Sequence, residues 1–501
     1  MNIVWFKRDL RIHDHKALSW AAETETVIPL YIFEPDLWRQ PDMSFQHFQF
    51  LKNCLLDLNQ SLTKLGQGLI IKVGSATEVF QQLHNEFGIK SIYSHQETWN
   101  HWTYRRDLEV KDWCKKKHIT WHEPTQNGVI RYLKDRDGWS GRWYKTMREN
   151  VSNPPSKLCS LKIASDQIPG PNELSLNTSF QNKDNIGGRK EAIHLLDSFL
   201  HQRGEGYTKE MSSPLTAYES CSRLSPHIAF GTISIKEVFQ AVERRKQKLK
   251  ELSKDRKGRW PSAIRSFSGR LRWHCHFIQK LEDDPSIEFK NMHPAYDNLR
   301  QDFFNEAYFL AWKEGRTGFP MIDACMRALI ETGWLNFRMR AMLMSFASYH
   351  LWLHWQKPAL YLAQLFTDYE PGIHYSQVQM QSGTTGINSI RIYNPIKQGL
   401  DHDPDGIFIR KWIPELIDMD NDYIHTPWKM PSQLNGYPMP IINEAEARKS
   451  AASQLYGLRK NRTHKETAQR IVKKHASRKQ SRSIRQRKQP SRNAQQGELP
   501  L

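Results

Sequence analysis

The chain has 501 residues, 39% of them hydrophobic and 25% charged, so it can bury a real core but is too long for one ordinary domain. Its formal net charge of +19 is concentrated at the end, where residues 459–492 hold 14 Lys and Arg against one acidic residue, Glu466. The charge indicates an anionic partner without distinguishing nucleic acid from a membrane surface.

The six cysteines are spread singly along the chain without a CxxC pair, which argues against a disulfide framework and a zinc site. The first residues, MNIVWFKRDLR, become charged too early for a secretory signal. The longest apolar stretch, residues 341–353, is shorter than the roughly 20 residues of a membrane helix. We therefore expect a soluble protein of a reducing compartment, with no membrane partner and no bound metal.

Residues 1–130 alternate short β-rich runs with stretches of helical periodicity, which predicts an α/β domain with a parallel sheet. No GxGxxG follows the first run, so the standard dinucleotide fingerprint is missing. The expected strands are residues 3–6, 27–33, 69–73, 91–94 and 119–121.

The rest of the chain divides into three parts. Residues 131–188, rich in Pro, Ser and Asn, are predicted to be an interdomain linker. Residues 189–445 form an all-α domain, and residues 446–501 form a basic tail, helical in pattern through Leu458 and then disordered. The expected helices of the all-α domain are 191–201, 235–249, 262–281, 301–314, 320–332 and 335–355.

Two clusters in the helical part point to anion binding. At 221–225 a Ser/Arg/Ser cluster precedes a helical segment and could bind phosphate, although an ordinary helix cap with a surface Arg is the alternative. Arg338 and Arg340 enter an apolar helix and need a buried anionic partner, for which Asp368 is a candidate, unless both face solvent. The nearby Trp312, Trp334, Trp352 and Trp355 are most simply interpreted as core residues.

Four blocks, in this order and spacing, resemble photolyases and cryptochromes. They are WFKRDLRIHDHKAL at 5–18, CSRLSPHIAFG at 221–231, WKEGRTGFPMIDACMRALIETGW at 312–334 and RIYNPIKQGLDHDPDGIFIRKWIPEL at 391–416. The resemblance covers roughly residues 1–440. It implies an all-α domain that binds FAD in a folded conformation, and an N-terminal domain that can hold an antenna chromophore, a folate or a deazaflavin.

The same resemblance assigns roles residue by residue. For FAD binding it implies Tyr207, Cys221, Ser222, Arg223, Leu224, Ser225, Arg338, Arg340 and Asp368. For the substrate or DNA side it implies Arg270, Trp273, His274 and Arg391. Trp355 and Trp312 match tryptophans of the family and are candidate electron-transfer residues.

The function implied is that of a deoxyribodipyrimidine photo-lyase, in which photoexcited reduced FAD gives an electron to a pyrimidine dimer flipped out of DNA. Such an enzyme would be a monomer in the cytoplasm, associated with the nucleoid, or in the nucleus of a eukaryote. One alternative is a cryptochrome-type blue-light photoreceptor without repair activity. Another is a nucleic-acid-binding protein whose flavin is structural or lost.

Several positions depart from the family pattern on the substrate side. Asn336-Phe337-Arg338 replaces the usual His-Asn-Arg, which makes repair of (6-4) lesions less expected. Arg270 stands where photolyases specific for cyclobutane dimers generally have Glu, and Ala341 where they tend to have Met. These changes put direct recognition of a dimer in doubt.

The block at 369–395 departs most. Ser376 and Val378 fall where the family usually has two tryptophans, so the usual electron relay would lose the member next to the flavin. Tyr369 or Tyr375 could provide an altered route. The residue facing flavin N5, usually Asn, falls near 372–374.

Overall fold

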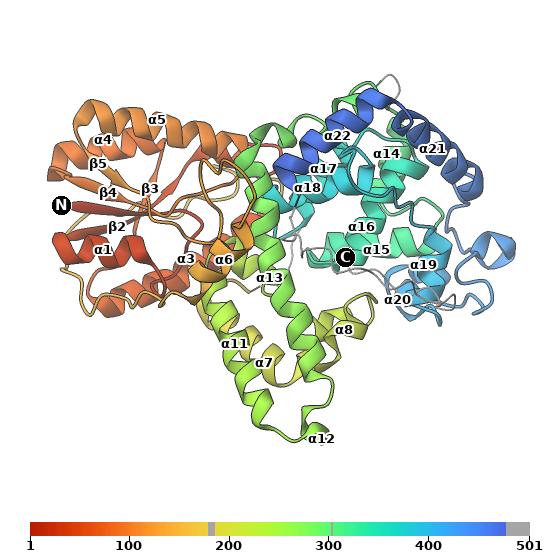
Figure 1. Ribbon diagram of the computed structural model, residues 1–501, viewed down its shortest axis with the longest axis horizontal. Helices are drawn as coiled ribbons and strands as arrows, with labels where there is room; N and C mark the ends of the chain where they lie inside the picture. The colour runs from red at the N-terminus through yellow and green to blue at the C-terminus, as the bar shows by residue number, and fades with distance from the viewer. Residues whose placement is uncertain (179–185, 302–303, 477–501) are drawn as a thin grey trace, which may run out of the picture.

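The computed structural model describes residues 1–178, 186–301 and 304–476, and Figure 1 shows an α/β half and a helical half lying side by side. The sheet has five parallel strands in the order β3-β2-β1-β4-β5, which confirms the predicted fold class. Its strands are β1 Asn2–Phe6, β2 Val27–Phe33, β3 Ile70–Val73, β4 Ser91–Tyr93 and β5 Thr120–His122.

Alternate side chains of the central strand β1 pack in two different hydrophobic cores. Val4 and Phe6 pack in the core that contains α1 (Lys16–Thr24) and α3 (Phe45–Leu65), whereas Ile3 and Trp5 pack in the core with α4 (Ala76–Phe87) and α5 (His101–Lys117). Because β1 pairs with both β2 and β4, the direction of winding reverses beside it. In open α/β sheets this reversal leaves a crevice at the carboxyl ends of the strands.

The helical half is built around α13 (Trp260–Asp283), the long helix that faces the α/β half in Figure 1. It packs most extensively on α18 (Pro371–Ser382), and Gly372 permits this approach, since a Cβ there would lie 2.6 Å from Ile278 Cα. The other main helices of this half are α7 Arg189–His201, α11 Ile235–Glu251, α14 Glu306–Lys313, α15 Pro320–Thr332, α16 Phe337–Ser345, α17 Gln356–Leu365, α19 Pro395–His402 and α20 Ile407–Trp412.

Two sequence-based boundaries differ from the structure. The predicted linker 131–188 contains a helix, α6 (Trp139–Arg148), whose Trp143 and Met147 are buried in one core with α11; the Pro- and Ser-rich sequence around it masked this short pattern. The single helix expected over 335–355 is instead α16 followed by a π-helical turn, Phe346–His350, after which the chain leaves the helix. An unbroken apolar run cannot reveal such a break.

The prediction of disorder beyond Leu458 is wrong for the part of the tail that the structure describes. After α21 (Glu444–Arg459), Asn461 caps a further helix, α22 (Arg462–His475), by accepting a hydrogen bond from Thr463 N. The buried face of α22 consists of His464, Ile471 and His475, so histidines occupy positions where a periodicity search looks for apolar residues. Residues 477–501 lie outside the described part.

No helix in the described ranges has both the length and the apolar character needed to cross a bilayer.

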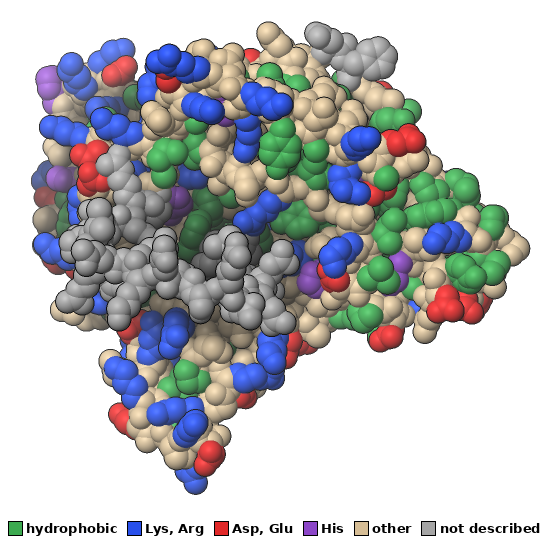
Figure 2. Space-filling model, turned by 45° about the vertical axis from the view of Figure 1, so that its right-hand side comes forward, with side chains coloured by type: hydrophobic (Ala, Val, Ile, Leu, Met, Phe, Trp, Pro, Cys, Tyr) green, Lys and Arg blue, Asp and Glu red, His purple; other side chains and the backbone are tan. Residues whose placement is uncertain are grey.

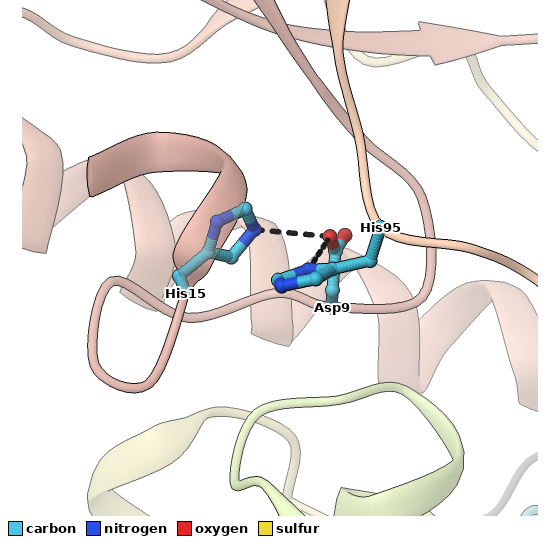
Figure 3. Close-up of side chains that lie close together, drawn as sticks. All are labelled: Asp9, His15 and His95. Carbon is cyan, nitrogen blue, oxygen red and sulfur yellow. Dashed lines mark hydrogen bonds and ion pairs between the residues drawn. The ribbon is translucent and has the colours of Figure 1, made fainter. Parts of the chain in front are cut away.

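The loop that follows β1 is fixed by a buried carboxylate, Asp9. Its Oδ1 accepts a hydrogen bond from Lys7 N at 2.8 Å, and its Oδ2 lies 2.7 Å from His95 Nδ1 and 3.0 Å from His15 Nε2 (Figure 3). Leu18 N donates to His15 Nδ1, so the proton of that ring is on Nε2, facing the carboxylate. Although three such side chains could hold a metal ion, this tautomer makes the cluster a hydrogen-bonded latch.

The same loop joins the two halves. Arg8 Nε donates to Ala229 O at 3.0 Å, Leu10 N to Phe230 O at 3.2 Å, and Arg11 Nη1 to Gly231 O at 2.9 Å. Gly231 has φ +69°, and a Cβ there would lie 2.2 Å from Arg8 O, so the backbones approach too closely for any side chain. The residues after β1 therefore set how the helical half sits against the sheet.

We expect Asp9→Asn to lower the free energy of unfolding by about 1–3 kcal/mol, because an amide cannot accept from all three donors and leaves buried groups unpaired. Urea unfolding at neutral pH measures this loss. Asp36→Asn, which removes the exposed ion pair with Arg39, is the matched control and should change stability by less than about 1 kcal/mol. Equal stability of the two variants would contradict the latch.

Candidate functional site

A cavity of about 170 Å³ lies in the helical half, with walls from α13, α16, α18 and the segment 366–370. Of the residues that the sequence analysis assigned to cofactor or substrate binding, Ser225, His274, Arg340 and Asp368 line it. The cavity thus brings together residues from four distant parts of the chain.

A two-fold hydrogen-bonded ion pair forms one wall of this cavity. Arg340 Nη1 and Nη2 donate to the two oxygens of Asp368 at 2.8 and 3.0 Å, the pairing expected from the sequence. Burial alone would raise the pKa of Asp368, but the charge and hydrogen bonds of Arg340, together with a hydrogen bond from Ser225, lower it. The carboxylate is therefore ionised and already oriented by the protein.

The 221–225 loop lies beside several cationic side chains. Arg203 holds it by donating to Cys221 O at 2.7 Å, and Arg223, with φ +56°, stacks its guanidinium on Tyr218 at 4.4 Å. Burial raises the pKa of Cys221 to about 12, against the lowering effect of the nearby charges of Arg203, Arg270, Arg223 and Arg340. Such an excess of positive charge suits an anionic group such as a phosphate.

The residues expected on the substrate side are not gathered in one place. Arg270 lies next to Tyr207, whose pKa burial raises to about 12 and a hydrogen bond with Arg270 lowers in part. Trp273 packs against His276 and Phe277, and Arg391 is exposed. His274 alone of this group lines the cavity, and burial lowers its pKa to about 4, so it is neutral at physiological pH.

The two candidate electron-transfer tryptophans lie in different aromatic groups. Trp312 is fully buried, contacts Phe309 and Tyr361, and donates to Leu343 O. Trp355 contacts Tyr375 with ring centres 6.2 Å apart and donates to Asn291 Oδ1 at 2.7 Å. Core packing accounts for Trp312, whereas Trp355 lies on a path toward the cavity.

That path runs through two tyrosines. Tyr369 lines the cavity and shares a hydrogen bond with Tyr375, which contacts Trp355. Ser376 and Val378, at the usual tryptophan positions, are buried and carry no ring. The aromatic side chains between Trp355 and the cavity are instead Tyr375 of α18 and Tyr369 of the loop before it.

Two residues that line the cavity have a buried side-chain oxygen without a hydrogen-bond partner among the described residues. The two atoms are Glu370 Oε1 and Gln377 Oε1. Buried polar groups are normally paired, so this set fits a polar ligand in the cavity. A flavin ring, which is flat and carries both donors and acceptors along one edge, has the chemistry that these atoms require.

Glu370 and Gln377 were missed by the sequence analysis. Both line the cavity, Glu370 as the residue that precedes α18 and Gln377 in the second turn of that helix. The only available signal was an acidic residue directly before a proline at a helix start, which is common at helix caps.

A second, much larger cleft of about 1030 Å³ lies at the carboxyl ends of β4 and β5. Trp99 and Trp121 from the α/β half, Glu282 at the end of α13, and Arg470 and Lys474 of α22 line it. The helix that the sequence analysis expected to be disordered is therefore one wall of this cleft.

Comparison with known proteins matches both halves. A sequence model described as DNA photolyase matches residues 2–148, and one described as the FAD binding domain of DNA photolyase matches residues 267–456.

Individual relatives match over nearly the whole chain. The chain is 28% identical over 475 residues to a deoxyribodipyrimidine photo-lyase of Buchnera aphidicola, covering 90% of this chain and 96% of the relative. It is 28% identical over 492 residues to cryptochrome-2 of Arabidopsis thaliana, covering 90% and 78%. An archaeal photolyase from Sulfolobus tokodaii, solved with two FAD molecules, superposes with a TM-score of 0.75 at 28% identity, covering 91% of this chain and all of that one.

We expect Asp368→Asn to destabilise the ligand-free protein by about 1–3 kcal/mol, because the partly buried Arg340 loses its charged partner. Glu415→Gln is a matched control, since Glu415 forms the same two-fold pair with Arg327 in a more exposed setting. Urea unfolding of both variants tests this, and a control loss as large as that of Asp368→Asn would contradict it.

Proposed function

The chain belongs to the photolyase/cryptochrome family, and on this premise we propose that it is a light-dependent DNA repair flavoprotein of the deoxyribodipyrimidine photo-lyase type. The observation that carries the proposal is the cavity of the helical half, which is lined by the Arg340–Asp368 pair and by Glu370 and Gln377, each with one buried oxygen that has no partner among the described residues. The photo-lyase among its relatives supports the same activity.

When bound, FAD would supply the light-driven transfer of one electron. The residues of the chain would hold it in place: Arg340 and Asp368 along the flavin ring, and Arg223 and Arg270 near its phosphates, where positive charge gathers around Cys221. His274 would present a neutral imidazole to the cavity. A neutral group there avoids a fixed positive charge beside the site of electron transfer.

DNA is the partner that this function requires. The net charge of +19 favours a polyanion, and Lys and Arg side chains are spread over the face shown in Figure 2, where Asp and Glu are fewer. Contacts of these cations with phosphates would supply binding that is independent of base sequence and weakens with salt.

The electron that reduces the flavin would travel through Trp355, Tyr375 and Tyr369. Support comes from the ring contact between Trp355 and Tyr375 and from the hydrogen bond between the two tyrosines, one of which lines the cavity. An oxidised tyrosine loses its phenolic proton readily, and the hydroxyl of Tyr369 donates to Asp42 Oδ2 at 2.8 Å, which provides an acceptor.

The large cleft is the place we propose for an antenna chromophore of the folate or deazaflavin class. Its volume suits a ligand of that size, and its Trp121 and the exposed Tyr104 offer surfaces for a flat ring. The Sulfolobus tokodaii structure, described as implying a novel light-harvesting cofactor, is a precedent for a second chromophore in a relative.

A second candidate function is a blue-light photoreceptor without repair. It is favoured by the position of Arg270, which lies with Tyr207 and Cys221 and leaves no carboxylate at the place where dimer-specific photolyases have Glu. The relative of the cryptochrome-2 type agrees with this alternative.

We expect the protein with reduced FAD to restore DNA that carries cyclobutane dimers under blue light, and to leave it unchanged in the dark. Chromatographic quantification of the dimers measures the repair. An absorption spectrum taken first establishes that FAD is bound. Bound FAD without repair of either cyclobutane or (6-4) lesions would overturn repair in favour of the photoreceptor, and colourless protein would contradict both.

We expect Tyr375→Phe to slow photoreduction of bound FAD by roughly tenfold or more, because phenylalanine can neither be oxidised readily nor release a proton. Loss of flavin absorbance under blue light with an external thiol measures the rate. Tyr361→Phe is the control, since Tyr361 contacts Trp312 outside the proposed path. Equal slowing in both variants would remove the path through Tyr375.

A further inference from the structure

Glu370 occupies the wall between two cavities. Together with Ala229 and His274 it lines both the flavin cavity and a smaller polar cavity of about 40 Å³. It is the residue immediately before α18, where its backbone is extended and its carboxyl group interacts with the backbone N–H of Gly372. Glu370 therefore borders both spaces from the start of this helix.

One oxygen of this carboxyl group is buried and has no hydrogen-bond partner among the described residues. The groups around it are Arg8 and Glu97 from the α/β half, His274 and Cys275 from α13, and the paired Arg340 and Asp368. Burial raises the pKa of Glu370 to about 8, which the charge of Arg8 opposes and that of Glu97 favours. At neutral pH the group is mostly a carboxylic acid and carries a proton that it can donate.

The smaller cavity leads from Glu370 toward solvent. It is lined by polar groups, among them Arg11, Gln126 and Asn127, and its volume is enough for water. At its other end Gln96, Glu97, Thr98 and Trp99 separate it from the large cleft, which they line as well. The three spaces form a series from the surface to the flavin cavity, and Glu370 is at the inner boundary.

We propose that Glu370 is the proton donor of the flavin cavity and is recharged from solvent through the smaller cavity. This inference rests on the placement of flavin under the proposed function, but it does not depend on DNA repair. The proposal gives Glu370 a catalytic role. Two positions later, the backbone of Gly372 packs so closely on Ile278 that no side chain fits there.

The step is balanced by a proton from solvent for each proton delivered. When an external reductant such as a thiol or dithionite reduces bound FAD, Glu370 would release its proton into the cavity, and the electrons of its broken O–H bond would remain on the carboxylate. Water in the smaller cavity then protonates the carboxylate and draws a replacement from bulk solvent. The reductant is oxidised, and Glu370 returns to its initial state.

Glu370→Gln tests this, because glutamine keeps the size and hydrogen-bonding capacity but has no acidic proton. Proton uptake during reduction of bound FAD by dithionite can be followed with an indicator dye in weak buffer. We expect the variant to slow uptake by roughly tenfold or more. Infrared spectra should also lose a carboxylic acid band that the wild type shows at neutral pH and loses above about pH 9, as follows from a pKa near 8.

Asp323→Asn is the matched control. Burial also raises the pKa of Asp323, to about 6, yet Asp323 lines none of the three spaces, so its variant should take up protons at the wild-type rate. Glu370→Asp, which keeps the acid on a shorter side chain, should restore part of the rate, whereas a purely structural role would not be rescued in this way.

Wild-type uptake kinetics in Glu370→Gln, or an unchanged infrared band, would overturn the proposal. If Glu370→Gln does not retain FAD, the test passes to Glu370→Asp, whose shorter acid lies farther from the cavity and should deliver protons more slowly. Proton uptake by Glu370→Asp at the wild-type rate or faster would then overturn the proposed role of Glu370. Neither measurement uses DNA. Absence of DNA repair would therefore refute the proposed function without affecting the role of Glu370. Unchanged proton uptake in Glu370→Gln would refute the role of Glu370 without affecting the proposed function.

Discussion

The docking of the loop after β1 onto residues 229–231 is the contact on which the rest of the molecule depends. Three consecutive backbone carbonyls of the helical half accept hydrogen bonds from Arg8, Leu10 and Arg11, and Asp9, between them, is held from the other side by two histidines. A loop that is fixed at both faces cannot shift without breaking a buried network. The small polar cavity lies along this seam, so its dimensions are set by the same contacts.

Charged side chains are distributed unevenly around the flavin cavity, so that its walls suit different chemical groups. Arg340 and Asp368 neutralise each other with good geometry, which makes their burial tolerable. Arg223 and Arg270 place positive charge near Cys221, and Glu370 avoids an unpaired charge by remaining protonated. One wall is thus suited to a polar ring, another to an anion, and a third to proton exchange.

The sequence predicted those parts of the molecule in which local pattern and tertiary packing agree. The runs that became β1 to β5 were recognisable because buried parallel strands are short, apolar and flanked by polar residues, and α15 was bounded correctly by Pro320 and Gly333. The pattern failed where packing overrides it. The buried face of α22 is largely histidine, and the π-helical turn interrupts an apolar run that continues beyond it. The raised pKa of Glu370 depends on burial in a cavity that is formed by residues far away in sequence.

The position of α22 ties the end of the chain to the large cleft. Because Arg470 and Lys474 form part of its wall, a ligand that touches them binds more strongly when the helix is docked than when it is not. Linkage is reciprocal, so occupation of the cleft would hold the helix in place by the same free energy. Occupation of the cleft would then change the fraction of molecules in which α22 is docked against the rest of the protein.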